Sequence, residues 1–516
     1  MIEFENKIFD SIIVGSGPAG VSVAWPLVKA GKQILMLDVG NESSQNFILK
    51  NNKNISSSPK IRAPEFSYVF KDFNERYKIQ SKNFSANGSL AKGGLSNAWS
   101  ALVSAFTNEE FEKFPFERND LLPHYNFVGK RIGISGDMSG DLINWLGNEY
   151  FKQKNLPIHP LIDKLLKKYD KNKLKIQNYG IKLGRHDQAI LSSPYNNRPA
   201  FSQNAMNGYR DTSGAAYNAG DEIKDLEKHK NFLYLPSYFV ENAIDQKSNC
   251  QVTAINTLKK TSHTFNAKIF ILAAGTIGST KIAMKIKKYF NKDISIQNTP
   301  MFPFALLFPG EIKRKPSYKA FSYWHMSYYL QLPNLASRHK IYGHFTPTDG
   351  IKVDELSARI PLPRPINTWI AKFLWPKMLL GTCIFPGYFS NNKIQLKENG
   401  SLSILGNTNE DYEKYVKESK RTLSRVFRKL GAILLTNPIS ATPGEDNHYA
   451  STMPMKKNPS EMETDSNGLL NGKGKIYVVD GSVLSELPAK SHTFTIMANA
   501  NRIGEHIAHR IETLKE

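Results

Sequence analysis

The chain has 516 residues, 40% of them apolar, and is long enough for a large core and for more than one domain. Its 68 lysines and arginines outnumber 46 aspartates and glutamates, which gives a net charge of +22. Such a balance favours anionic partners in general. No nucleic-acid-binding motif accompanies it, so we expect solvated surface lysines and no nucleic-acid partner.

Cysteine content and the lengths of apolar runs indicate the cellular compartment to expect. Cys250 and Cys383 are too few for a disulfide framework, and neither lies in a CxxC pair, so we expect a reducing compartment and no metal site. The N-terminus lacks the basic and apolar regions of a secretory signal. The longest charge-free apolar run, Met378 to Ser390, is shorter than the roughly 20 residues of a spanning helix. The sequence predicts a cytoplasmic protein and leaves peripheral membrane contact open.

A dinucleotide-binding signature opens the chain. Phe9 to Val14 predicts a buried strand, and the glycine-rich residues 15–20, GSGPAG, lead into a helix that reaches Ala30. A second apolar run, Ile34 to Leu37, ends at Asp38. Strand, glycine turn, helix, strand and acid in this order are typical of a Rossmann unit that binds NAD or FAD. The helix N-terminus would face the pyrophosphate, and the acid would accept hydrogen bonds from ribose hydroxyls.

Two further glycine turns follow. Residues 91–100, AKGGLSNAWS, suit a loop that lies against the pyrophosphate or ring edge of a flavin. Residues 268–279, KIFILAAGTIGS, predict another buried strand, turn and helix, and so indicate one interrupted nucleotide-binding domain. Pro26 lies inside the first predicted helix, where it removes an N–H and predicts a kink.

The middle of the chain predicts antiparallel strands. Alternating aromatic and polar runs, such as 321–332 and 339–346, and an Asn-Gly hairpin within 394–404, indicate the sheet of a substrate domain. Apolar residues from Ile366 to Leu374 recur at helical spacing. We expect that helix to pack into the core, with a membrane surface as the alternative. Residues 411–430 predict a second amphipathic helix.

Two histidines lie in short motifs near the C-terminus. His448 belongs to NHYASTMPM, and His492 lies between a strand that ends at Asp480-Gly481 and a helix that starts at Thr495. Removing hydride from an alcohol carbon requires removal of the hydroxyl proton as well, and a neutral imidazole suits that task near pH 7. A second imidazole can stabilise the developing alkoxide. We predict His448 as the base and His492 as its partner, and the exchange of roles stays open.

In family order, GSGPAG with its strand and acid, GGLSNAWS, AAGTIGS, HYASTMPM and VVDGSV…SHTFTIMANA resemble the signatures of the glucose–methanol–choline (GMC) flavoprotein oxidoreductases. The resemblance spans residues 9 to about 508. GGLSNAW and HY-x-x-T-x-PM most resemble the carbohydrate-oxidising branch. The acid after the second strand is often Glu in the family, and Asp38 is one methylene shorter. The resemblance implies FAD, with oxidation of an alcohol by hydride transfer to flavin N5.

The implied fold is α/β, or α+β overall, with a Rossmann-type FAD-binding domain interleaved with a substrate domain on an antiparallel sheet. We expect residues 1–130, 190–290 and 440–516 in the FAD-binding domain, and 131–189 and 291–439, with helical excursions, in the substrate domain. The implied catalytic pair is His448 and His492. The residues expected at the cofactor are Gly15, Gly17, Pro18, Ala19, Gly20, Asp38, Gly93, Gly94, Ser96, Asn97, Ala274, Gly275, Asp480, Gly481, Thr493 and Phe494.

The resemblance leaves the substrate open. A sugar or glycoside is the first expectation. A lipid-like or long-chain alcohol at a membrane is the alternative, motivated by residues 369–388 and by the basic charge. A lyase or light-driven decarboxylase, or a binding protein that keeps FAD as structural support, are further alternatives. The electron acceptor, which could be oxygen, a quinone or a protein, is equally open.

Overall fold

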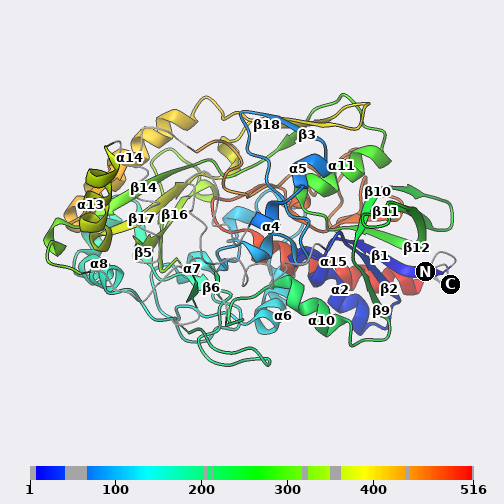
Figure 1. Cartoon of the computed structure of the whole chain (residues 1–516), viewed down its shortest axis with the longest axis horizontal. Coiled ribbons are helices and arrows are strands. Elements are labelled where there is room, and N and C mark those ends of the chain that lie inside the picture. The colour runs from blue at the N-terminus through cyan, green and yellow to red at the C-terminus, as the bar shows by residue number, and fades with distance from the viewer. Residues whose placement is uncertain are drawn as a thin grey trace.

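The computed structural model describes residues 7–40, 67–202, 206–207, 210–211, 213–315, 324–348, 362–436 and 441–513. Figure 1 shows an elongated molecule in which strands from both ends of the chain share one sheet beside the two termini. A second large sheet, flanked by α8, α13 and α14, occupies the opposite end.

The sheet near the termini has seven strands. Its order is β10 (Tyr238–Asp245), β11 (Cys250–Asn256), β12 (Ser262–Leu272), β1 (Ile8–Val14), β2 (Ile34–Leu37) and β9 (Phe232–Leu235), and β21 (Ile476–Val478) also pairs with β12. The strands β1, β2, β9, β12 and β21 are parallel. Val14 pairs with both Leu37 and Leu272, and Leu272 with Val478, so four strands end at one edge. Ligands of such sheets bind at that edge.

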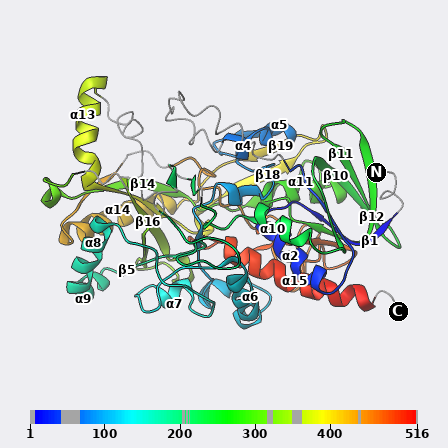
Figure 2. The same ribbon diagram turned by 60° about the horizontal axis from the view of Figure 1, so that its bottom comes forward.

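Helices cover this sheet. The first, α2 (Pro18–Lys29), packs along α15 (Thr493–Thr513), which Figure 2 shows running towards the C-terminus. The others are α6 (Leu122–Ile132), α10 (Ala219–Leu226) and α11 (Thr276–Ile286). The helix α2 continues through Pro26, whose ring lies against Gly504; a Cβ added to Gly504 would come within 2.6 Å of the proline Cγ. The proline therefore serves the contact between α2 and α15.

The sheet at the opposite end is antiparallel and has six strands. Its order is β20 (Ile433–Thr436), β14 (Met301–Leu307), β17 (Met378–Ile384), β16 (Ile341–Pro347), β15 (Met326–Leu330) and β5 (Ile181–Gly184). The helices α8 (Pro160–Lys171) and α14 (Tyr412–Lys429) bury their apolar faces in the same core. Aromatic rings dominate this core, as in the contacts of Phe345 with Phe304, Tyr328 and Phe427.

The predicted Asn-Gly hairpin forms, with Gly400 at a φ of 76° in the turn between β18 (Asn392–Leu396) and β19 (Leu402–Leu405). It does not belong to the six-stranded sheet. It lies in a separate sheet in the order β13 (Ile294–Ile296), β18, β19 and β3 (Ile79–Lys82). Ile394, Leu402 and Ile404 bury their side chains against Tyr77 and Ile277, beside the first sheet. Hairpin periodicity did not indicate that partner.

The helix expected in the core, α13 (Arg364–Leu374), projects from the body of the molecule (Figure 2). Asn367 and Ala371 face the protein, whereas Ile366, Trp369 and Phe373 are 50%, 67% and 43% exposed. The expectation of core packing is therefore wrong for this apolar stripe. Helical spacing reveals that a stripe exists, but not which surface it faces. No helix among the described residues is long and apolar enough to cross a membrane.

Several shorter elements connect these helices and strands. They are α4 (Ser67–Phe70), α5 (Phe73–Arg76), α7 (Ile143–Leu146), α9 (Lys173–Gln177), β4 (Leu102–Val103), β6 (Asp187–Gln188), β7 (Met206–Asn207), β8 (Arg210–Asp211) and the 3₁₀ turns η2 (Gly94–Asn97) and η11 (Gly481–Val483).

Candidate active site

The first glycine turn has the shape of an anion cradle. Gly15 has a φ of 100°, and a Cβ there would lie 2.5 Å from the carbonyl oxygen of Ala273. A Cβ on Gly20 would lie 1.9 Å from the carbonyl oxygen of Gly15, so neither position accepts a side chain without rearrangement. A Cβ on Gly17 meets nothing within 4 Å. Gly17 precedes Pro18, the first residue of α2, so the open side faces the helix N-terminus.

The second glycine loop lies beside the first. A Cβ on Gly94 would be 3.3 Å from the Cα of Gly17, and the N–H of Gly93 donates to Ser16 Oγ (2.9 Å). Ser96 and Asn97, expected to approach the flavin, use their side chains inside the loop. The Ser96 hydroxyl donates to the Gly93 carbonyl (2.6 Å), and Asn97 Nδ2 donates to the carbonyls of Lys92 and Gly94 (both 2.8 Å). These side chains hold the conformation of the loop, and they leave its backbone as the part that could contact a ligand.

Asp38 directly follows β2 and is buried. Its Oδ2 accepts hydrogen bonds from the Ser16 hydroxyl and from Tyr234 OH (3.2 Å). Burial raises the pKa of this carboxyl to about 6, although the hydrogen bonds from Ser16 and Tyr234 oppose the shift. Tyr234 lies on the neighbouring strand β9, and no motif in the sequence predicted that it would join this cluster.

The third turn connects the first sheet to the C-terminal segment. The Ala274 N–H donates to Ser279 Oγ (3.0 Å), and the Ser279 hydroxyl donates to Asp480 Oδ2 (2.5 Å). The other oxygen of Asp480 accepts from the N–H (3.0 Å) and the hydroxyl (2.5 Å) of Ser482. A Cβ on Gly481 would lie 2.7 Å from Thr276 Oγ1, so the two turns are in close contact. Asp480 therefore ties α11 to η11, and its burial raises the pKa of its carboxyl.

The structure brings the two predicted histidines together. The ring centroids of His448 and His492 are 4.8 Å apart and the rings are nearly perpendicular, at 85°. His448 lies in the loop before the Ser451–Gly481 backbone contact, and His492 directly precedes α15. Thr493 and Phe494 open that helix, and the Phe494 ring packs in the core against Tyr125 and Tyr150.

The environment of the pair keeps both imidazoles neutral at pH 7. Burial lowers the pKa of His492 well below its usual value, and charge on His448 acts in the same direction. Burial also lowers the pKa of His448, while the negative charge of Asp446 opposes that shift. His492 Nδ1 has no hydrogen-bond partner among the described residues, although it is buried. His448 Nδ1 lies 3.1 Å from Thr299 Oγ1.

A buried ion pair holds the segment that carries His492. Lys490 Nζ lies 2.8 Å from Glu110 Oε2 and donates to the carbonyls of Ala105 (2.9 Å) and Trp145 (2.5 Å). The side chains of the pair are 0% and 3% exposed, so each charge depends on the other. Ser104 Oγ also donates to the Ser491 carbonyl (3.0 Å). These contacts were not predicted, because residues 104–110 carry no motif.

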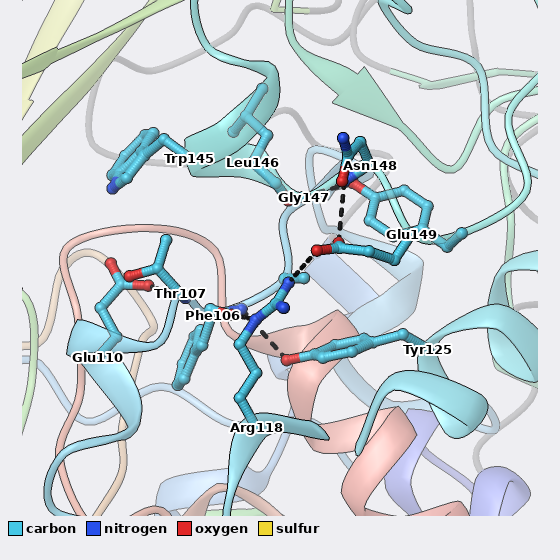
Figure 3. A network of polar contacts seen from close by, with 12 residues as sticks. Phe106, Thr107, Glu110, Arg118, Tyr125, Trp145, Leu146, Gly147, Asn148 and Glu149 are labelled. Atoms are coloured by element: carbon cyan, nitrogen blue, oxygen red, sulfur yellow. Dashed lines mark hydrogen bonds and ion pairs between the residues drawn. The ribbon is translucent and has the colours of Figure 1, made fainter. Parts of the chain in front are cut away.

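Figure 3 shows how the supporting loops are themselves held. The Arg118 guanidinium donates to the Phe106 carbonyl (2.7 Å) and to Glu149 Oε1 (2.9 Å). Tyr125 OH accepts from the Phe106 N–H (3.1 Å). It also lies 2.7 Å from Thr495 Oγ1 in α15. The network thus links the 104–110 and 145–149 segments to the helix that follows His492.

Two more neutral histidines come from the six-stranded sheet and its edge. His344 in β16 is buried, its Nδ1 has no partner among the described residues, and its pKa is lowered well below the usual value by burial and by charge on His186 and His448. His186 Nδ1 lies 2.7 Å from Ser327 Oγ and 2.8 Å from Tyr342 OH, while its Nε2 is likewise without a partner in the described part. Burial lowers the pKa of His186 to about 3.

This chain is similar to known proteins over nearly its full length. No family profile matches the sequence. The paromamine 6'-oxidase of Streptomyces fradiae is 19% identical and is aligned over 98% of this chain and 92% of its own length. Two variant structures of the formate oxidase of Aspergillus oryzae superpose over 99% of this chain and all of theirs, with TM-scores of 0.66 and 0.64 and 14% identity. Both similarities extend over nearly the whole chain, and the superposition shows that it has the fold of the formate oxidase.

The observed sheets and the superposition confirm the fold class expected from the sequence, a Rossmann-type domain combined with an antiparallel sheet. The formate oxidase structures concern the modification of FAD in that enzyme. The described residues contain no group of three or more His, Cys, Asp or Glu side chains that could hold a metal ion. The domain boundaries, the catalytic roles and the individual cofactor contacts of this chain stay predictions.

Proposed function

We propose that this chain is a GMC oxidoreductase that binds FAD and oxidises an alcohol group to a carbonyl. The observation that carries the proposal is the pairing of His448 and His492, 4.8 Å apart, beside the edge where the parallel strands and glycine turns end. FAD, when bound, supplies the acceptor for the hydride at its N5 position. The residues of the chain supply binding, orientation and movement of the proton.

The nucleotide half of the cofactor fits the described residues. Gly15, Gly17 and Gly20 would leave room for the pyrophosphate at the N-terminus of α2, where free N–H groups and the helix dipole favour anions. Gly94 would close the same side. Asp38 would accept from ribose hydroxyls. The backbone around Gly275, Gly481 and Thr493 would contact the flavin.

The proton of the substrate hydroxyl would pass to a histidine. A buried imidazole with a lowered pKa is neutral at pH 7 and carries a lone pair on one ring nitrogen, as a general base requires. His448 is our assignment for the base. His492 would donate to, and thereby stabilise, the alkoxide that develops as the proton leaves.

A sugar or glycoside is the substrate class that we favour. The relative from Streptomyces fradiae is named as an oxidase of paromamine, which supports a carbohydrate alcohol. The present chain carries a net charge of +22, which does not favour a polycationic amino sugar. Among the described residues, Asp446 is the carboxylate whose charge acts on the histidine pair, and both its oxygens are already hydrogen-bonded. An uncharged sugar fits these surroundings.

Anaerobic absorbance spectroscopy tests the proposal. The purified protein is expected to show an oxidised flavin spectrum that neutral sugars or glycosides bleach, and readmission of air then separates an oxidase from a dehydrogenase. A flavin that no alcohol bleaches would contradict alcohol oxidation and favour a lyase, a decarboxylase or a structural role for FAD. Failure to bind added FAD would overturn the proposal as a whole.

A lipid-like alcohol at a membrane is the second candidate, because α13 exposes Ile366, Trp369 and Phe373 beside Arg364 and Lys372. Co-sedimentation with anionic and with neutral phosphatidylcholine vesicles would test it. Binding to anionic vesicles that is lost in Trp369→Ser, together with bleaching by a long-chain alcohol, would favour this substrate. Equal recovery of both proteins in the supernatant would remove it.

A further inference from the structure

A chain of hydrogen bonds leads from the four-stranded sheet to His448. Asn392 Nδ2 in β18 donates to Asn298 Oδ1 (2.8 Å), and Asn298 Nδ2 donates to Asp446 Oδ1 (3.0 Å). The other carboxylate oxygen, Asp446 Oδ2, accepts from the N–H (2.8 Å) and the hydroxyl (2.6 Å) of Thr299. Thr299 Oγ1 then lies 3.1 Å from His448 Nδ1.

The direction of each hydrogen bond follows from the groups involved. An amide nitrogen and a backbone N–H can only donate, so both oxygens of Asp446 accept, as an ionised carboxylate does. The Thr299 hydroxyl has one hydrogen and two neighbours that could accept it. The bond to the charged carboxylate is shorter by 0.5 Å (2.6 Å against 3.1 Å) and is the stronger kind. The Thr299 oxygen is then left to accept, and the hydrogen in its bond to His448 must come from Nδ1.

We propose that Thr299 and Asp446 are positioning residues that hold neutral His448 in the tautomer with its hydrogen on Nδ1. The lone pair then lies on Nε2, the nitrogen that would take the proton from the substrate hydroxyl. The use of this lone pair in catalysis rests on the proposed function, whereas the tautomer is a property of the protein that can be observed without turnover.

In the proposed oxidation of the alcohol, each broken bond has an acceptor for its hydrogen and its electrons. The substrate O–H bond breaks and its proton binds His448 Nε2, while the C–H bond breaks and its hydrogen leaves with the electron pair to the oxidised flavin as the two-electron acceptor. The alcohol becomes a carbonyl. His448 becomes an imidazolium whose Nδ1–H still donates to Thr299, and the negative charge of Asp446 stabilises that cation through the threonine hydroxyl.

The two histidines differ in their hydrogen-bond partners and in the charges that act on them. His492 Nδ1 has no hydrogen-bond partner among the described residues, so nothing in that part of the chain selects its tautomer. Charge on His448 lowers the pKa of His492, whereas the charge of Asp446 acts to raise that of His448. The geometry favours His448 as the proton acceptor, with His492 free to orient its ring towards the substrate.

Nitrogen-15 NMR of the full-length flavoprotein with ring-labelled histidine tests the tautomer, because the two ring nitrogens differ strongly in shift between the protonated and the lone-pair state. His448→Gln assigns the signals. We expect wild-type His448 to show a protonated Nδ1 and a lone pair on Nε2 at pH 7.5. Thr299→Val, which keeps the shape of the side chain but removes the hydroxyl, should give a mixture of tautomers. Thr299→Ser is the matched control and should keep the wild-type pattern.

A wild-type ring protonated on Nε2, or a Thr299→Val spectrum that equals the wild-type spectrum, would overturn the proposal. Asp446→Asn provides a second measurement should the valine variant not fold. Its loss of negative charge should lower the pKa of His448 in an NMR pH titration, and an unchanged titration would count against the proposal. The NMR pattern also separates this inference from the proposed function. Flavin that no alcohol bleaches contradicts the function alone, and a wrong tautomer contradicts the positioning alone.

Discussion

The two sides of the candidate active site differ in how their polar groups are paired. The nucleotide side consists of the first two glycine turns and Asp38. Its polar side chains are paired: Ser16 with Asp38 and with the Gly93 N–H, and Ser96 with the Gly93 carbonyl. The backbone at Gly17 borders open space. On the histidine side, His492, His344 and His186 each keep a ring nitrogen without a partner among the described residues. Buried polar atoms without partners cost free energy, so they indicate a place where a ligand or water supplies the missing bond. The polar side chains of the first side are paired within the protein, whereas ring nitrogens of the second side are left for a ligand or water to bind.

His448→Gln should separate the two sides most strongly. Turnover is expected to fall by about 10²- to 10⁴-fold, the usual contribution of a general base. Flavin content should not change, because the glycine turns and Asp38 do not contact this side chain. His509→Gln is the matched control, because His509 is 85% exposed on α15. Equal loss of flavin and of activity in His448→Gln would show that the two sides are not independent.

Lys490→Met tests the support of the histidine side. Removing one partner of the buried pair leaves Glu110 unpaired, and about 3–5 kcal/mol of the free energy of unfolding should be lost in chemical denaturation. Adding Glu110→Gln should recover part of it. Lys228→Met is the control, because Lys228 and Asp225 form an ion pair in which both side chains are more than half exposed, and its effect should stay within about 0.5 kcal/mol. Equal effects of the two single variants would contradict a structural role for the buried pair.

Asp38→Asn tests the nucleotide side through pH. The pKa of Asp38 is about 6 in the folded chain against 3.8 for an ordinary aspartate, so the folded state binds more protons between these values. The free energy of unfolding of the flavin-free protein should therefore fall as the pH rises from 4 to 6, by on the order of 3 kcal/mol in total. The asparagine variant should lose that dependence. Chemical denaturation of the wild type and of Asp38→Asn at several pH values between 4 and 6 measures this difference in pH dependence.

Asp225→Asn, at an exposed carboxylate, is the matched control for that experiment and should keep the wild-type profile. A profile of Asp38→Asn that runs parallel to the wild-type profile over pH 4 to 6 would contradict the raised pKa of Asp38.

Gly20→Ala should have the smallest effect on stability and still affect the nucleotide side alone. The added Cβ would press on the Gly15 carbonyl, and overpacking of this kind costs about 1–3 kcal/mol. We expect weaker FAD retention in a dilution assay, while His448 keeps its NMR signature. Gly310→Ala is the control, because a Cβ there meets nothing within 4 Å. Unchanged FAD affinity in Gly20→Ala would remove this turn from the cofactor site.

Much of the fold could be predicted because its signals are local. Continuous apolar runs predicted β1 and β2, and the glycine-rich residues 15–20 form the expected turn, in which Gly15 and Gly20 leave no room for a Cβ. Helical spacing predicted α14 with its buried face intact. The same kind of pattern was misleading for α13 and for the sheet that contains the Asn-Gly hairpin. An apolar stripe or a hairpin turn predicts the local element, but not the part of the protein against which that element packs.

By itself, the sequence determined the unit of strand, turn, helix and acid that follow one another within 31 residues from Ile8 to Asp38. It also supplied the two histidines. Only the tertiary structure decided what surrounds them: Thr299 lies 149 positions from His448, and Glu110 lies 380 positions from Lys490. Side-chain pairs of that separation depend on how whole sheets pack, because a single polar residue carries no periodicity and no turn preference that would reveal its partner.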